Sequence, residues 1–155
     1  MNQFPLVISL ILRDRSVDLE TSDYKDLFLN EAREYISTLN NSLVELEKDP
    51  SHKEAIREIF RAAHTLKGMS ATMGYEPMAR LCHQMETVLD SVRSGNKPLT
   101  SRMVDALFVC LDQLENWVQI LTQQDFIEEE RLQKPFDEVA DIGAALFRGI
   151  TGILP

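Results

Sequence analysis

Glycine, proline and cysteine are scarce in this sequence, with 6, 6 and 2 residues among 155. Segments rich in Leu, Ala, Glu, Lys, Arg and Met therefore run on without a break, and the alternating patterns of β-strands are sparse. The two cysteines, Cys82 and Cys110, have no metal-ligand spacing, and no secretory context suggests that they pair. The composition predicts an all-α domain in which both thiols are reduced and buried among apolar neighbours.

Positive charge is scarce as well, because 16 lysines and arginines face 25 acidic residues and give a formal net charge of −9. This balance argues against nucleic acids and anionic membranes as partners, since both bind clustered cations. The apolar run from Phe4 to Leu12 is shorter than the roughly 20 residues of a membrane span, and it lacks the features of a signal peptide. We expect a cytoplasmic protein without membrane insertion, in which residues 1–21 either pack on the domain or form an extension without a role.

Four long segments repeat apolar residues every three or four positions, as amphipathic helices do. We predict that the first helix starts at Ser22 and stops at Asp49-Pro50. Ser51 and Glu54 have the spacing of a capping box and are predicted to open the second helix. A glycine commonly follows a helix end, and Gly74 is predicted to do so here.

Similar signals bound the two helices that follow. Pro77 suits the first turn of the third helix, and the run Ser94-Gly95-Asn96 is predicted to end it. Thr100 or Ser101 is expected to cap the fourth helix. The apolar stripes of the four helices place many large side chains in one core, among them Phe28, Leu66, Met85 and Trp117.

Short loops between strong helices favour antiparallel neighbours. We therefore predict that residues 22–122 form an up-and-down antiparallel four-helix bundle. Residues 123–155 are expected to hold a charged linker and, after Pro135, a fifth C-terminal helix with a weaker apolar pattern.

One face of the predicted second helix is polar and carries a histidine. Residues three, four and seven apart share a helix face, and this spacing joins a strip of six residues. The strip consists of Arg57, Arg61, His64, Lys67, Gly68 and Ala71. Because the apolar residues of this helix lie largely on the other side, His64 is expected to be exposed or at the margin of the core.

Gly68 stands one turn beyond His64, inside a good helix. A glycine there costs about 1 kcal/mol relative to alanine, so its presence calls for a reason. It either clears the approach to the imidazole for a bulky group, or it allows close packing of another helix. The local sequence leaves both readings open.

The three histidines lack metal-ligand spacing, and a bundle whose apolar residues all have core positions leaves little room for a general base beside a substrate. A neutral imidazole is also a nucleophile, and Lys67 is placed to neutralise charge on an incoming phosphoryl group. His83 and Glu86 share one face of the third helix. If that helix packs antiparallel to the second, the Glu86 carboxylate can hold one ring nitrogen of His64.

The stretch "HTLKGMSATMGY" (residues 64–75) resembles the signature of histidine phosphotransfer (HPt) domains, and most of all the N-terminal phosphotransfer domain of CheA-type chemotaxis kinases. The resemblance extends roughly from Ser22 to Thr122 and includes the helix order and "LCHQMETVLD" (residues 81–90) on the next helix.

This resemblance implies that the His64 imidazole accepts a phosphoryl group. It also implies that Lys67 assists with phosphoryl charge, that Glu86 hydrogen-bonds the other ring nitrogen, and that His83 belongs to the same polar cluster. Gly68 would be the small residue that clears access, and the rest of the strip, with Arg57, Arg61 and Ala71, would be the docking surface.

The resemblance further implies two kinds of partner: an ATP-binding kinase domain of the CheA type, and response regulators such as CheY or CheB that receive the phosphoryl group on an aspartate. ATP and Mg²⁺ would be bound by those partners, so this chain, expected to be monomeric, needs no cofactor or metal and is no enzyme by itself. No nucleotide-binding signature follows the bundle, which suggests a piece of a CheA-type kinase. The alternatives are a stand-alone phosphorelay protein, a helical interaction module that is not phosphorylated, and a small hydrolase or metalloprotein.

Overall fold

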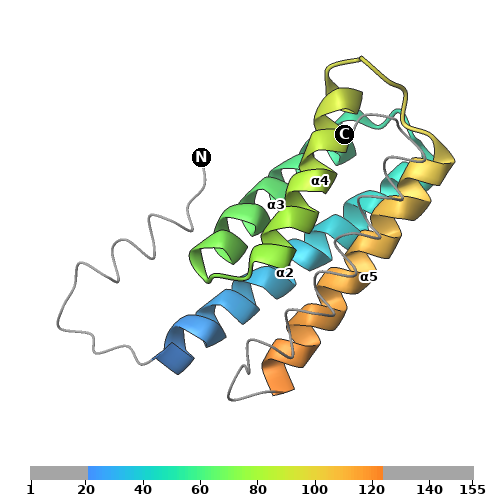
Figure 1. Cartoon of the computed structure of the whole chain (residues 1–155). Helices are drawn as coiled ribbons and strands as arrows, with labels where there is room; N and C mark the ends of the chain where they lie inside the picture. The colour runs from blue at the N-terminus through green and yellow to red at the C-terminus, as the bar shows by residue number, and fades with distance from the viewer. Residues whose placement is uncertain (1–20, 124–155) are drawn as a thin grey trace.

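Long runs of good helix formers give four helices in the part of the chain described by the computed structural model, residues 21–123. They are α2 (Thr21–Lys48), α3 (Lys53–Thr72), α4 (Glu76–Arg93) and α5 (Ser101–Gln123). Each helix runs opposite to the one before it (Figure 1). The contacting pairs are α2 with α3, α3 with α4, α2 with α5 and α4 with α5, so the predicted antiparallel four-helix bundle is confirmed. The expected fifth helix and the extension before Thr21 lie outside the described residues.

The core lies between the four helices and is built from their apolar stripes. Its largest fully buried side chains include Trp117, Phe28, Leu66 and Met85, as the periodicity predicts. Each such side chain contributes about 1.5–3 kcal/mol when it leaves water. Leu29, Ile36 and Met69 are buried as well.

The start of α3 differs from the prediction. The residue that caps this helix is His52, whose Nδ1 accepts a hydrogen bond from the Ala55 backbone N–H at 3.1 Å. Ser51 instead donates both its backbone N–H and its hydroxyl to Asp49 Oδ1, at 3.0 and 2.6 Å. The predicted capping box of Ser51 and Glu54 is wrong, because this turn engages Ser51 before the helix begins.

The turn between α3 and α4 determines how these two helices pair. Gly74 follows the end of α3 with a φ of +77°, which glycine adopts without steric cost. Its N–H donates to the Ala71 carbonyl, and the Tyr75 N–H donates to the Ser70 carbonyl at 2.8 Å. Pro77 then occupies the first turn of α4. The predicted signals at Gly74 and Pro77 are confirmed, and they place α4 antiparallel against α3.

The remaining helix boundaries also follow their sequence signals. Helix α4 ends at Arg93, and Gly95 has a φ of +81° just beyond it. Thr100 caps α5, because its hydroxyl accepts the Met103 N–H at 3.2 Å. None of the helices within residues 21–123 is long and apolar enough to cross a membrane.

Candidate functional site

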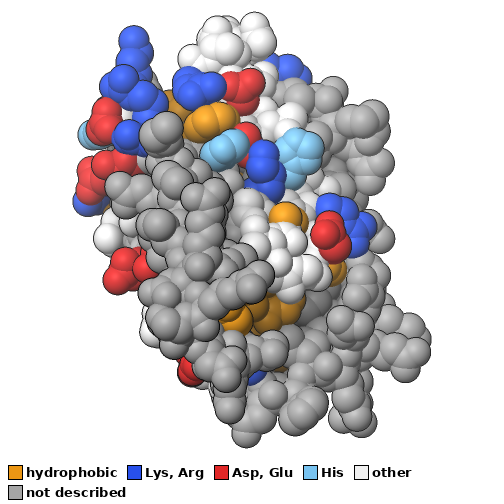
Figure 2. Space-filling view, turned by 90° about the vertical axis from the view of Figure 1, so that its left-hand side faces the viewer, with side chains coloured by type: hydrophobic (Ala, Val, Ile, Leu, Met, Phe, Trp, Pro, Cys, Tyr) orange, Lys and Arg blue, Asp and Glu red, His pale blue; other side chains and the backbone are white. Residues whose placement is uncertain are grey.

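His64 lies on the exposed side of α3, near the middle of the helix. Half of its side chain is exposed to solvent, 50%, whereas its neighbours Ala63 and Thr65 are buried. The whole predicted strip follows this side: Arg57, Arg61 and Ala71 are exposed, and Lys67 and Gly68 are partly so. Figure 2 shows histidine, basic and acidic side chains gathered on one face of the bundle.

Glu86 on α4 holds both polar residues at the centre of the strip. Its Oε1 lies 2.9 Å from His64 Nδ1, and its Oε2 lies 2.7 Å from Lys67 Nζ. The Glu86 side chain is 15% exposed, so this carboxylate lies deeper than the two groups that it binds. The antiparallel turn at Gly74 brings these side chains together from two helices.

Two opposing effects act on the pKa of Glu86. Partial burial raises it, but the hydrogen bonds and charges of Lys67 and His64 lower it by more, so the pKa lies below its ordinary value. The carboxylate is therefore ionised at neutral pH and acts as an acceptor alone. A neutral imidazole beside it carries its proton on Nδ1 and keeps the lone pair on Nε2. This tautomer leaves Nε2 free to act as a nucleophile.

The other predicted site residues take different positions. Arg57 and Arg61 both form ion pairs with Glu54, at 3.0 and 3.2 Å, on the exposed side of α3. His83 is exposed on α4, and within residues 21–123 no hydrogen bond or ion pair joins its side chain to the His64, Lys67 and Glu86 group.

Sequence reasoning missed the contact of Phe60 with His64 and that of Arg93 with Phe60. The Phe60 ring lies nearly parallel to the imidazole, at an angle of 11° and a centroid distance of 6.3 Å. The Arg93 guanidinium carbon lies 3.9 Å from the centroid of the Phe60 ring. The i,i+4 spacing of Phe60 and His64 was a signal for the first contact, whereas the contact of Arg93 depends on how α4 packs.

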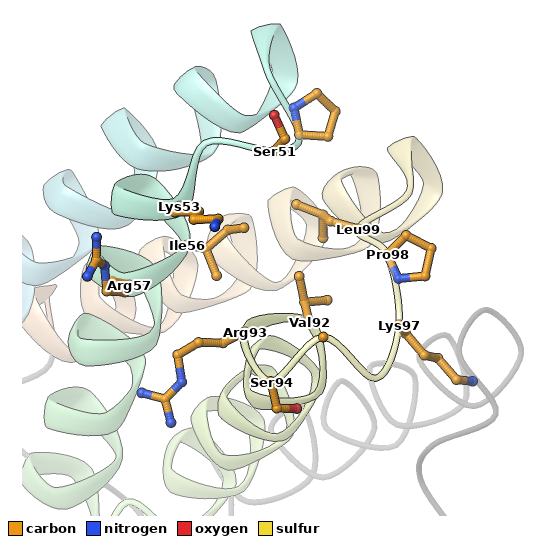
Figure 3. A pocket seen from close by; sticks show the side chains of 12 residues that line it. Ser51, Lys53, Ile56, Arg57, Val92, Arg93, Ser94, Lys97, Pro98 and Leu99 are labelled. Atoms are coloured by element: carbon orange, nitrogen blue, oxygen red, sulfur yellow. The ribbon is translucent and has the colours of Figure 1, made fainter.

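A hollow of about 780 Å³ opens beyond this group, where α3 begins and α4 ends (Figure 3). Ile56, Val92 and Leu99 supply apolar side chains to it. The charged residues that line it are all basic: Lys53, Arg57, Arg93 and Lys97. His64 does not line the hollow. No cluster of three or more His, Cys, Asp or Glu side chains within residues 21–123 could hold a metal ion.

The fold and the site define a class of protein: a small helical bundle that presents a carboxylate-held imidazole on an exposed helix face. The model of the Hpt domain family matches residues 23–119, which is more than half of the chain. The chain therefore belongs to the Hpt domain family.

Individual proteins agree with this assignment. The chain is 50% identical over 101 residues to the chemotaxis protein CheA of Bacillus subtilis, an alignment that covers 65% of this chain and 15% of that protein. Among solved structures, the CheA phosphotransferase domain from Thermotoga maritima matches with a TM-score of 0.65 and 41% identity, over 67% of this chain and 99% of that one. The phosphorylated P1 domain of CheA3 from R. sphaeroides, solved in complex with CheY6, shares the fold at a TM-score of 0.64 and 20% identity. The chain spans about a sixth or less of the length of the CheA proteins from B. subtilis and from Listeria.

Proposed function

We propose that this chain is the phosphotransfer domain of a CheA-type chemotaxis kinase and that His64 is its phosphoacceptor. The observation that carries the proposal is the exposed imidazole whose Nδ1 lies 2.9 Å from the ionised Glu86 carboxylate. That contact leaves the Nε2 lone pair free on a ring that is half exposed, so that a phosphodonor can approach it. Membership of the Hpt domain family and the identity to CheA proteins support the same reaction.

The reaction uses the chain's own residues in a simple way. The Nε2 lone pair attacks the γ-phosphorus of ATP held by a kinase domain, a P–N bond forms, and the bond from phosphorus to the β,γ-bridging oxygen breaks, so that ADP leaves. The imidazole becomes cationic, and the Glu86 carboxylate stabilises the Nδ1–H that now carries part of this charge. Lys67 is 30% exposed beside Glu86 and can move its ammonium group toward the phosphoryl oxygens.

The second transfer reverses these roles. An aspartate carboxylate of a response regulator, such as CheY or CheB, attacks the phosphorus, the P–N bond breaks, and its electron pair returns to Nε2. The imidazole leaves as the neutral Nδ1–H tautomer that Glu86 favours. Because ATP and Mg²⁺ would be held by the kinase domain and the regulator, we expect a cytoplasmic carrier that has no cofactor of its own and acts as a monomer.

The remaining strip residues have less direct roles in this proposal. Gly68 has no side chain and Ala71 has only a methyl group, one and two turns beyond His64, which leaves space for a partner. Arg57 and Arg61 supply cations on the approach to the imidazole, although each is partly neutralised by Glu54. Within residues 21–123 no hydrogen bond or ion pair joins the His83 side chain to His64, so His83 is expected to tune the charge of this surface rather than to touch the phosphoryl group.

The test is to incubate the chain with the separate ATP-binding portion of B. subtilis CheA and radiolabelled ATP. We expect acid-labile, base-stable label on the wild-type chain and none on His64→Gln. Subsequent addition of a response regulator should remove the label. Equal labelling of both chains would contradict the assignment of His64, and an unlabelled wild-type chain would favour an interaction module that is not phosphorylated.

A further inference from the structure

Phe60 lies beside the imidazole and Arg93 lies over Phe60, in a layered arrangement that is separate from the hydrogen bond between His64 and Glu86. The Phe60 ring, on α3, stacks beside His64 at 11° and 6.3 Å, within the range of offset aromatic pairs. Arg93, on α4, covers the Phe60 ring at 3.9 Å, a cation–π distance. Asp90 in turn accepts a hydrogen bond from Arg93 at 2.7 Å. Arg93 and Phe60 therefore link Asp90 to His64 through three successive contacts.

Because His64 is half exposed, its ring needs more than one contact to keep a fixed orientation. An imidazole that is 50% exposed and bound through one nitrogen can still turn through a limited angle about its Cβ–Cγ bond, because a single hydrogen bond tolerates some bending. Rotation swings Nε2 away from any fixed direction of attack. A ring lying parallel to the imidazole restricts this rotation, and a guanidinium on that ring keeps the ring in place. Glu86 thus holds the edge of the imidazole through Nδ1, and Phe60 holds its face.

We propose that Phe60 and Arg93 are positioning residues for His64: Phe60 restricts the plane of the imidazole, and Arg93 acts through Phe60. The proposal rests on the proposed function, because it concerns the direction of Nε2 during phosphoryl transfer. Small errors in the direction of attack slow reactions strongly, while the affinity for the partner stays the same. Positioning therefore changes kcat and leaves KM unchanged.

The separate effects on kcat and KM distinguish a positioning role from a docking role. Arg93 also lines the basic hollow where α3 begins and α4 ends, and Figure 3 shows it there together with Arg57. If Arg93 served to bind the partner, its loss would raise KM. If it acts through Phe60, its loss lowers kcat and has no effect once Phe60 has been replaced.

The experiment measures phosphorylation of variants by the ATP-binding portion of B. subtilis CheA over a range of chain concentrations. Phe60→Leu keeps an apolar side chain on the core and should lower kcat about fivefold. Arg93→Gln should lower kcat about threefold, and Arg93→Lys, which keeps a cation, should restore most of it. The double variant Phe60→Leu, Arg93→Gln should equal Phe60→Leu alone. Arg102→Gln, an exposed arginine outside this contact, is the matched control and should equal the wild type.

A second readout does not depend on phosphorylation. The ¹⁵N shifts of the two ring nitrogens report the fraction of neutral His64 that is protonated on Nδ1. We expect this fraction to fall in Phe60→Leu and in Arg93→Gln, while circular dichroism shows an intact bundle. An unchanged fraction and an unchanged kcat in a folded Phe60→Leu, or a rise in KM alone for Arg93→Gln, would overturn the proposal. A wild-type chain that takes no phosphate would defeat the proposed function, and the ¹⁵N shifts would still decide the positioning.

Discussion

Helices α3 and α4 each have two faces, and residues adjacent in sequence fall on opposite ones. On α3, Leu66 is fully buried while Lys67 reaches solvent; on α4, Cys82 is fully buried while His83 is exposed. The buried faces repeat apolar side chains that other residues of similar size could replace. The exposed faces carry a particular set of polar groups at fixed distances. The first pattern gives the fold, and the second gives the chemistry.

The largest expected difference between buried and exposed positions concerns the reactivity of the two buried cysteine thiols. Burial raises the pKa of the Cys82 thiol, and it raises that of Cys110 to about 12. Thiolate is the reactive form, so both thiols should react with Ellman's reagent at pH 8 at least about a thousandfold more slowly in the native chain than in urea. Rapid reaction of either thiol in the folded chain would show that the two faces are not separated as described.

The second largest expected difference is in the unfolding free energy lost when a residue of each face is replaced. Leu66→Ala removes a fully buried side chain and should cost about 2–5 kcal/mol of unfolding free energy. Lys67→Ala, the matched change at the next residue, should cost less than about 1 kcal/mol, because solvent screens a partly exposed ion pair. Urea unfolding followed by circular dichroism measures both. Similar losses of unfolding free energy in Leu66→Ala and Lys67→Ala would contradict the expected difference between the buried and exposed faces.

Catalytic effects should show the reverse order. Glu86→Ala removes the group that holds Nδ1 and should slow phosphorylation of His64 about tenfold, because both the tautomer and the ring direction lose support. Its unfolding free energy should change by less than about 1 kcal/mol. Initial rates with the B. subtilis kinase portion give the first quantity. Unchanged transfer kinetics in Glu86→Ala would remove Glu86 from the mechanism.

The smallest predicted effect is a dependence of stability on pH. Because the pKa of Glu86 is lower in the folded chain than in the unfolded one, its contribution to stability is complete above the unfolded value, near 4.5, and is lost as pH falls through the folded value. In chains that carry His64→Gln, which removes the imidazole beside Glu86, the stability difference between Glu86 and Glu86→Gln should therefore be constant from about pH 7 to pH 5 and shrink below about pH 4.5. A stability difference that grew as the pH fell would contradict this prediction.

The sequence predicted the bundle because helix periodicity and turn residues are local signals. Gly74 and Pro77 identified the α3–α4 turn, and once that turn is antiparallel, Glu86 must lie near His64. Ser51 shows the limit of this approach: its capping box was a sound local motif, but Asp49 competes for the same hydroxyl and His52 offers a ring nitrogen instead. Arg93 was missed for a related reason, since its contact with Phe60 depends on the angle between two helices.

The central claim is that one particular histidine of this chain carries the phosphoryl group. The chain has 3 histidines, so His52 and His83 serve as internal controls in the same molecule. After phosphorylation by the kinase portion, fragmentation mass spectrometry at neutral pH can locate the added phosphate. The phosphate is expected on His64 alone. Phosphate on His83 or His52, or on a serine or threonine with His64 unmodified, would contradict it.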